Sequence, residues 1–221
     1  NDTTTLRVSF TRDQDSWNIK IESRSAQDNW NIKLHMTAKA VKAEQIVPSG
    51  HIADFLRGPQ IPLEPLTVYK NQLSVGLYHG DSFQKIKHAV KVPQGILGII
   101  ADYNGELHNL ADKSVCLLDS CLQLFRFAHN VNNISNNSGY LLTSLEKINI
   151  ANIDWSRWKG FWCLAVHRDK TSDREFITDF AFFTENGEKI GEIIGAKEVG
   201  VGLLADNYAS VQAPSQDENR N

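Results

Sequence analysis

Residues 117–125 read Leu-Leu-Asp-Ser-Cys-Leu-Gln-Leu-Phe, a run that sets one acid and one amide among mostly apolar residues. Asp119 and Gln123 stand four positions apart, so on a helix their side chains project from the same face. The apolar neighbours predict that this helix, over about residues 115–129, is buried. A buried carboxylate is costly unless it is paired, and proteins that keep one commonly use it. Asp119 is therefore a candidate functional acid, with a helix-capping aspartate as the alternative.

Strand patterns surround this helix on both sides. Apolar residues alternate with polar ones, or run together between turn signals, in residues 6–10, 17–21, 31–41, 84–92, 96–103, 141–150, 161–167, 175–183 and 189–200. Turns are predicted at 12–15, 93–95 and 185–187, and a short helix at 65–73 that ends at Gly76. One long helix among many antiparallel strands indicates an α+β fold.

The chain divides into four parts. Residues 44–66 hold four of the six prolines, which argues against regular structure and predicts a linker. This linker separates residues 1–43 from a longer unit at 67–202. Residues 203–221 are expected to form a polar, disordered tail.

Composition excludes several classes of partner. The 221 residues carry a net charge of −3, and no basic run or stripe appears, so we predict no nucleic-acid partner. The longest apolar stretches are too short to span a bilayer, so we predict no membrane association.

Three cysteines bear on the compartment. Cys116, Cys121 and Cys163 have no metal-ligand spacing, and an odd, unpatterned count fits a reducing compartment. We expect a cytoplasmic protein without a metal, in which the two helix cysteines are core residues. Asn133 and Asn136 begin glycosylation sequons, which we interpret as accidents of an asparagine-rich loop.

A second motif precedes the helix. Residues 76–84 read Gly-Leu-Tyr-His-Gly-Asp-Ser-Phe-Gln. With Asp119 and Gln123, this resembles polyketide synthase dehydratase domains, which carry Gly-Leu-x-Tyr-Gly-Pro-x-Phe-Gln and then Asp-x-x-x-Gln or Asp-x-x-x-His on a central helix. His79 stands where the family has Tyr, and Asp81 where it has Pro. Gly76, Leu77, Gly80, Phe83 and Gln84 match.

The resemblance extends over about residues 5–202. It implies a double hotdog, in which each curved antiparallel sheet wraps around a central helix. Residues 1–43, with Trp17 and His35, resemble the closing strands of the first hotdog. Residues 67–202 resemble the second hotdog, whose last two strands match residues 176–195.

The resemblance also implies a reaction. Such dehydratases remove water from 3-hydroxyacyl thioesters carried on the phosphopantetheine of an acyl carrier protein, without a further cofactor. Asp119 would be the general acid, kept protonated by burial, and Gln123 would hold it or the substrate hydroxyl. The candidate substrate-binding residues are Tyr78, His79, Gly80 and Phe83.

The family's catalytic histidine belongs to a His-x-x-x-Gly-x-x-x-x-Pro motif in the first hotdog, and the sequence contains no such motif. We therefore expect the chain by itself to hold half of an active site. Expected partners are the acyl carrier protein, neighbouring synthase domains and a second copy in a homodimer.

Two other readings stay open. Asp81 and the Ser114-Val115 pair, which replaces a His-Pro that often precedes the acid, favour a hotdog that binds acyl chains or scaffolds neighbouring domains without catalysis. An enzyme of the same fold that migrates double bonds or closes rings is a related version of the leading reading, and the retained Asp119 favours dehydration over it. An extracellular β-rich binding module is the third reading, and it would carry glycans at Asn133 or Asn136.

Overall fold

A computed structural model describes residues 4–25, 32–41, 50–74, 76–102, 110–127, 139–151, 159–168 and 174–202. They belong to two compact units, Asn1–Ile46 and Val47–Asn221. Each unit has its own sheet.

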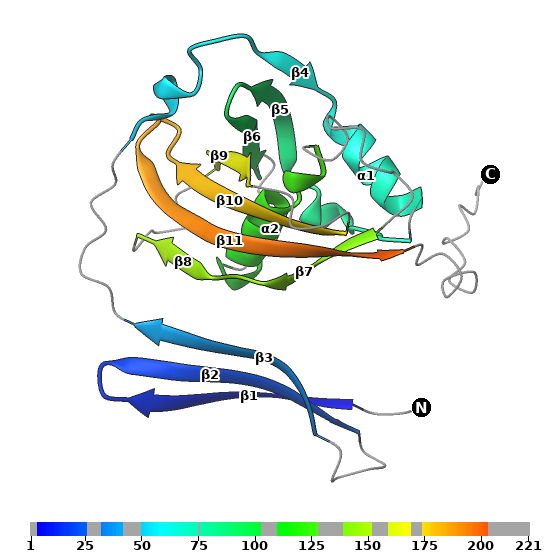
Figure 1. Cartoon of the computed structure of the whole chain (residues 1–221), viewed down its shortest axis with the longest axis vertical. Coiled ribbons are helices and arrows are strands. Elements are labelled where there is room, and N and C mark those ends of the chain that lie inside the picture. The colour runs from blue at the N-terminus through cyan, green and yellow to red at the C-terminus, as the bar shows by residue number, and fades with distance from the viewer. Residues whose placement is uncertain are drawn as a thin grey trace, which may run out of the picture. The chain divides into compact units, whose positions relative to one another are not determined.

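The first unit is a three-stranded antiparallel sheet of β1 (Thr4–Asp13), β2 (Ser16–Ser25) and β3 (Ile32–Val41), in that order (Figure 1). Period-2 alternation gives it an apolar face and a polar face, because residues directly opposite each other point to the same side. Phe10 pairs with Ile19 and Val8 with Ile21 on the apolar face. Large side chains of this face, among them Phe10 and Trp17, are exposed.

The second unit is an eight-stranded antiparallel sheet with helices. Its elements are η1 (Ile52–Asp54), β4 (Ile61–Leu63), α1 (Pro65–Ser74), η2 (Asp81–Phe83), β5 (Ile86–Val92), β6 (Gly95–Ala101), α2 (Leu110–Leu122), β7 (Gly139–Ser144), β8 (Lys147–Ile150), β9 (Gly160–His167), β10 (Glu175–Phe183) and β11 (Lys189–Gly202). The strand order is β4-β5-β6-β9-β10-β11-β7, and β8 also pairs with β11.

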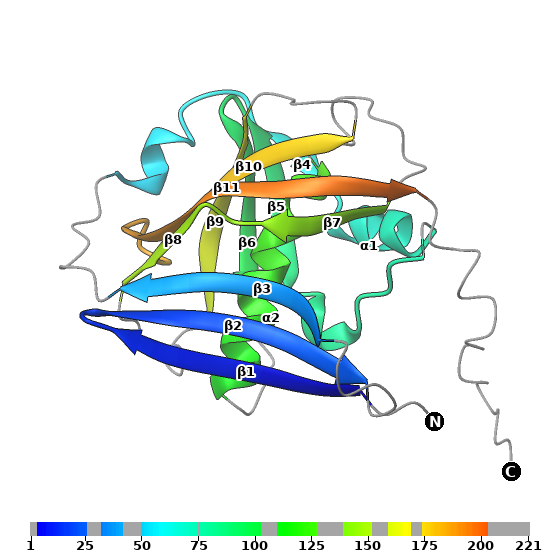
Figure 2. The ribbon, with the colours of Figure 1, turned by 60° about the horizontal axis from the view of Figure 1, so that its bottom comes forward.

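Helix α2 packs against the middle of this sheet, on β6 and β9. Figures 1 and 2 show the strands curving around it. Leu117, Cys121 and Leu124 are fully buried in the main core cluster, and burying a leucine side chain contributes about 1.5–3 kcal/mol. Gly98 of β6 permits the close approach, because a Cβ there would lie 2.7 Å from a methyl carbon of Leu124.

The opposite face of the sheet is covered by the segment around η1. Ile52 packs with Leu97, Leu164 and Phe183 in a second buried cluster. Neighbouring strand residues alternate between the two clusters, since Ile96 of β6 belongs to the main cluster and Leu97 to the second. The strands of the middle of the sheet are therefore apolar on both faces.

The structure confirms the α+β architecture of a curved antiparallel sheet around one central helix, but it changes several bounds. Helix α2 begins at Leu110 rather than about residue 115 and ends at Leu122, with a further helical turn at 125–127. The predicted strand at 141–150 is two strands, β7 and β8. The proposed linker at 44–66 is not wholly irregular, because η1 lies in it and β4 pairs with β5.

Some predictions lie outside the described residues. They concern the tail at 203–221 and the glycosylation sequons at Asn133 and Asn136. Cys116, Cys121 and Cys163 are buried free thiols, which confirms that the two helix cysteines are core residues. In the part of the chain that the structure describes, no helix is long and apolar enough to cross a membrane.

Candidate functional site

The structure brings Asp119 and Gln123 together as the spacing predicts. Asp119 lies in the last turn of α2, and the backbone N–H of Gln123 donates to the Asp119 carbonyl at 3.1 Å, which continues the helical register past Leu122. The side-chain Nε2 of Gln123 donates to Asp119 Oδ2 at 2.6 Å. One carboxylate oxygen is thereby fixed by the amide.

The expected burial of the acid is wrong in part. The Asp119 side chain is 40% exposed, whereas Gln123 is only 4% exposed. The difference arises because position 119 lies at the margin of the helix face that packs on the sheet, while position 123 lies against the 76–84 segment. The pair therefore has a buried amide and a carboxylate that solvent reaches.

The 76–84 segment surrounds the Gln123 amide. The Nε2 nitrogen of Gln123 lies 3.1 Å from the Phe83 carbonyl oxygen and 3.3 Å from His79 Nδ1. His79 Nδ1 is also 4.0 Å from Asp119 Oδ2. The Gln84 side chain holds this segment by donating to the His79 carbonyl at 2.6 Å.

Electrostatics of the site depend on burial and on Asp119. Burial lowers the pKa of His79, the negative charge of Asp119 opposes that change, and the positive charge of Arg126 adds to it. Burial also raises the pKa of Tyr69, on α1, to about 12, and Asp119 contributes to the rise. The Tyr69 hydroxyl accepts the backbone N–H of Ile86 at 3.2 Å, which fixes α1 to the start of β5. Both groups are neutral at neutral pH.

The other predicted binding residues are placed differently. Tyr78 is 73% exposed, so its ring does not form a buried pocket wall. Gly80 has a φ of −58°, and a Cβ there would meet no atom within 4 Å. Phe83 is half-buried and contributes its backbone carbonyl to the amide cluster.

Ser120 is a residue of the site that the sequence analysis missed. Its Oγ lies 2.8 Å from the carbonyl oxygens of both Phe83 and Cys116, and it accepts the Lys85 backbone N–H at 3.3 Å. This hydroxyl joins α2 to the strand that follows the 76–84 motif, and so fixes the rotation of the helix. In the sequence, only its position next to Asp119 indicated that Ser120 belongs to the site.

A buried ion pair and a buried arginine were also missed. Lys85 and Asp102 are fully buried, with 3.3 Å between Lys85 Nζ and Asp102 Oδ1. Arg126 donates to the Tyr140 carbonyl and lies 4.6 Å from the centroid of the Phe125 ring. Burial lowers the pKa of Arg126 to about 10, against the attraction of Glu198.

Glu198 of β11 is completely buried. Its Oε2 lies 3.4 Å from Thr178 Oγ1, which donates, and burial raises the pKa of Glu198 to about 8. The alternation of the strand could have predicted that Glu198 is buried, because position 198 faces the same side of β11 as the buried Ala196.

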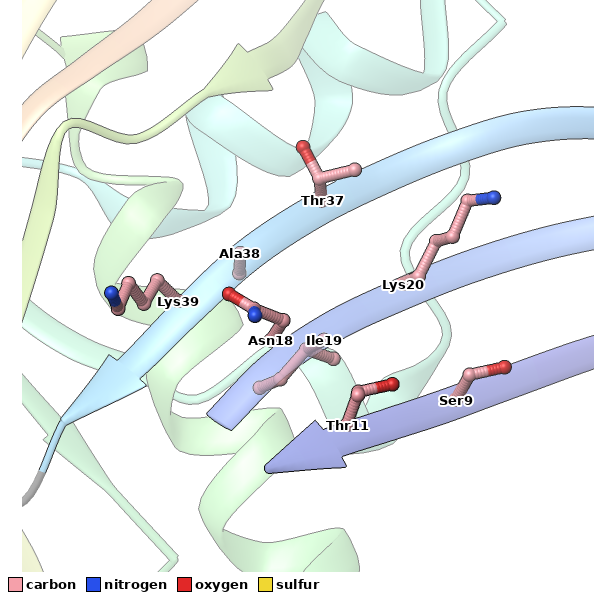
Figure 3. Close-up of a pocket in the computed structure, with 8 residues that line it drawn as sticks. All are labelled: Ser9, Thr11, Asn18, Ile19, Lys20, Thr37, Ala38 and Lys39. Atoms are coloured by element: carbon pink, nitrogen blue, oxygen red, sulfur yellow. The ribbon is translucent and has the colours of Figure 1, made fainter. Parts of the chain in front are cut away.

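The first unit has a shallow depression on its sheet. Figure 3 shows its lining residues, Ser9, Thr11, Asn18, Ile19, Lys20, Thr37, Ala38 and Lys39. Lys20 pairs with Glu22 at 2.6 Å and Lys39 with Asp13 at 3.5 Å. The lining contains no carboxylate, imidazole or thiol, so it offers no acid–base pair comparable to the one on α2.

Comparisons with known proteins agree with the fold. The family model described as "Polyketide synthase dehydratase N-terminal domain" matches residues 56–197. The description names the N-terminal domain, whereas the motifs predicted the second hotdog for this part of the chain. No curated protein matches the chain.

Several solved structures are similar. The dehydratase domain from the CurJ module of curacin polyketide synthase has a TM-score of 0.76 at 20% identity, over 90% of this chain and 69% of that chain. The dehydratase domain from the CurF module has a TM-score of 0.71 at 21% identity, over 90% of this chain and 68% of that chain. The dehydratase domain of RzxB from Pseudomonas fluorescens has a TM-score of 0.66 at 15% identity, over 88% of this chain and 67% of that chain. At these identities the structures support the hotdog fold.

The matched region covers more than half of the sequence and includes both the 76–84 motif and the Asp119–Gln123 pair. The chain therefore belongs to the polyketide synthase dehydratase family.

Proposed function

We propose that this chain is a dehydratase segment of a modular polyketide synthase, which converts 3-hydroxyacyl thioesters on an acyl carrier protein into enoyl thioesters. The observation that carries the proposal is the half-exposed Asp119 carboxyl, held at one oxygen by the buried Gln123 amide at 2.6 Å. A general acid must be positioned by the protein and still be reached by substrate, and this arrangement meets both needs.

The reaction assigns one proton transfer to Asp119. A base removes the proton on the α-carbon of the acyl chain, and the electron pair of that C–H bond forms the double bond to the β-carbon. The bond between the β-carbon and the hydroxyl oxygen breaks, and protonated Asp119 gives its proton to that oxygen, so that water leaves. Gln123 keeps Oδ2 occupied, which directs the proton to Oδ1.

The base would be a histidine of the first hotdog, as in the family resemblance. We assign the three-stranded sheet of residues 4–41 to the closing strands of that first hotdog, and residues 67–202 to the second. The upstream position of the sheet and the order of the two motifs support this assignment. The 76–84 segment, with His79, Gly80 and Phe83, would line the acyl site beside Asp119, and exposed Tyr78 would meet the carrier-bound substrate at its rim.

The remaining proposals concern partners and compartment. The substrate chemistry requires an acyl carrier protein with its phosphopantetheine arm, and the family operates beside other synthase domains, which we propose here together with a homodimer. The three free cysteines support a reducing, cytoplasmic compartment.

The test is turnover of a 3-hydroxyacyl-carrier thioester, followed by mass spectrometry for the loss of water. The 221-residue chain and the same chain extended by its native upstream sequence are compared. Asp119→Asn should lower kcat about 10²–10⁴-fold, the usual contribution of a general acid. Asp54→Asn, which changes an exposed acid of η1, should leave turnover unchanged.

Two results would contradict the proposal. If Asp119→Asn keeps full activity, the acid lies elsewhere. If the folded, extended protein turns over no 3-hydroxyacyl thioester, but moves the double bond of an enoyl thioester, it is an isomerase of the same fold. The retained Asp119 argues against this second reading, because an isomerising relative can do without the acid.

A further inference from the structure

The Gln123 amide lies between three acceptors but has only two N–H bonds. Asp119 Oδ2, the Phe83 carbonyl oxygen and His79 Nδ1 lie 2.6, 3.1 and 3.3 Å from Gln123 Nε2. The Oε1 atom of Gln123 has no hydrogen-bond partner among the described residues. Because all three acceptors lie at one end of the amide, that end is the nitrogen.

Of the three acceptors, His79 Nδ1 is the one that turns from an acceptor into a donor when its ring takes up a proton. A neutral imidazole with its proton on Nε2 accepts at Nδ1, as the 3.3 Å contact requires. A protonated imidazole carries a proton on Nδ1 as well, which would face the N–H bonds of Gln123. The Nδ1 proton then has one acceptor nearby, Asp119 Oδ2 at 4.0 Å.

We propose that His79 is a positioning residue that makes the hydrogen bond from Gln123 to Asp119 depend on pH. Neutral His79 orients the amide toward the acid, and cationic His79 repels the amide and pairs with the Asp119 carboxylate instead. The proton that the pair takes up at lower pH then resides on His79 and not on Asp119, so the fraction of Asp119 in the protonated form that dehydration needs stops rising as the pH falls. The catalytic consequence rests on the proposed function, while the switch in hydrogen bonds does not.

The charged surroundings favour the neutral imidazole. The charged groups that act on His79 are Asp119 of α2 and Arg126 of the helical turn that follows it, and Tyr69 of α1 interacts with the same carboxylate. Tyr69 is neutral at neutral pH, so among the described residues Asp119 is the negative charge that stabilises a cationic His79. Burial and Arg126 oppose it and lower the pKa of His79. The switch therefore belongs to mildly acidic pH, below the ordinary range of about 6.5 for histidine.

The family's tyrosine would not behave this way. A phenol stays neutral through this pH range, whereas the histidine at position 79 adds a titrating group beside the acid. The pH response is thus a property of this chain rather than of the motif.

The direct test uses NMR on the isotope-labelled 221-residue chain. The side-chain amide signals of Gln123 and the carboxyl signal of Asp119 are followed between about pH 5 and pH 8, the range in which histidine titrates. We expect both signals to move with one shared midpoint, that of His79. In His79→Asn, whose side-chain oxygen can still accept from Gln123 but cannot titrate, the Gln123 signals should lose the transition at the His79 midpoint.

His88→Asn is the matched control, because His88 is an exposed histidine of β5. It should leave the titration of Gln123 unchanged. His79→Tyr, which keeps an aromatic ring, serves as a second non-titrating variant if His79→Asn folds poorly. Gln123 signals that titrate identically in the parent and in a folded His79 variant, or that do not titrate in the parent, would overturn the proposal.

Kinetics separate this inference from the proposed reaction. For the active, extended protein, the ratio of parent to His79→Asn kcat should fall as the pH drops through the His79 midpoint, while KM stays the same. Any other histidine base titrates in both proteins and cancels in this ratio. A ratio that is flat with pH would overturn the catalytic consequence. If no dehydration occurs but Gln123 titrates as expected, the proposed function fails and the His79 switch stands.

Discussion

At the residue scale, the site contrasts a half-exposed acid with a fully buried one. Asp119 is open to solvent and fixed by one short hydrogen bond. Glu198 has no solvent contact, and among the described residues its Oε1 has no hydrogen-bond partner. Arg126 attracts it without a direct ion pair being formed in this part of the structure. Burial decides the protonation of Glu198, and it is neutral at neutral pH.

Glu198→Gln should change how stability depends on pH. The pKa of Glu198 is about 8 in the folded chain against an ordinary 4.5, so the folded state binds the extra proton between these values. The contribution of protonated Glu198 to the free energy of unfolding is fully present below about pH 4.5 and is lost as the pH rises through about 8. Glutamine mimics the neutral acid, so the variant should be about 1–3 kcal/mol more stable than the parent above pH 8, the usual cost of an unsatisfied buried group.

Urea unfolding at several pH values measures this difference. Glu175→Gln is the control, because Glu175 is a partly exposed acid that pairs with Lys197 at 3.1 Å. If the free energy of unfolding falls with rising pH by the same amount in the parent and in Glu198→Gln, the prediction is wrong.

The sequence predicted the parts of the site that depend on helix geometry. Spacing alone placed Asp119 beside Gln123. It did not predict that His79 and Phe83 converge on the same amide nitrogen, because that depends on how the 76–84 segment folds over α2 some forty residues away. The exposed fraction of Asp119 was missed for a related reason, since an apolar run does not say which position lies at the margin of the packed face.

At the scale of elements, one small residue of β6 allows the segment at the end of α2 to lie close to the sheet. Gly98 leaves room for Leu124, and the rotation of the helix is fixed by the contacts of Ser120 with the 83–85 segment. The acid is therefore oriented by residues that need not touch substrate.

Gly98→Ala should destabilise the chain by about 1–3 kcal/mol, the range for overpacked cores. The added methyl would lie 2.7 Å from a methyl carbon of the buried Leu124, which must move α2 or leave its rotamer. Gly80→Ala is the matched control, since its Cβ would meet no atom within 4 Å and its φ of −58° suits alanine. Thermal and urea unfolding measure both. Equal stability of the two variants would show that α2 does not depend on this close contact.

The division of one predicted strand into β7 and β8 also has an element-scale cause. Residues 141–150 show no break in the sequence, but both strands pair with β11, where Gly195 adopts a φ of +64°. The Glu146 side chain lies where a Cβ of Gly195 would be. The irregularity of β11 at Gly195 separates the residues that pair with β7 from those that pair with β8. The residue that divides the predicted strand therefore lies about fifty positions further along the chain.

At the scale of the whole molecule, the two units differ in what stabilises them. Both buried clusters consist of residues from Val47–Asn221, with none from Asn1–Ile46. Apolar residues of the three-stranded sheet, such as Leu6, Phe10 and Trp17, are exposed. From the prolines of 44–66 and the family resemblance we predicted separate parts at 1–43 and 67–202, and their identity as parts of two hotdogs stays a prediction.

Removing residues 1–46 should leave a remainder that still unfolds cooperatively, because both buried clusters consist of residues from Val47–Asn221. Calorimetry and urea unfolding of the shortened chain measure this. Loss of cooperative unfolding in the shortened chain would show that the clusters need the first unit.

The strand order also determines how long β6 lacks its neighbour strand while the chain is being synthesised. Strand β6 pairs with β9, Ala101 opposite Gly160, so its partner emerges from the ribosome about sixty residues later. At about 5–20 residues per second, the edge of β6 waits about 3–12 s for that partner while α2 is already made. During this interval α2 and the β5–β6 hairpin are already available to each other. Synthesis speed across residues 102–159 therefore sets how long an unpaired apolar edge is available for aggregation.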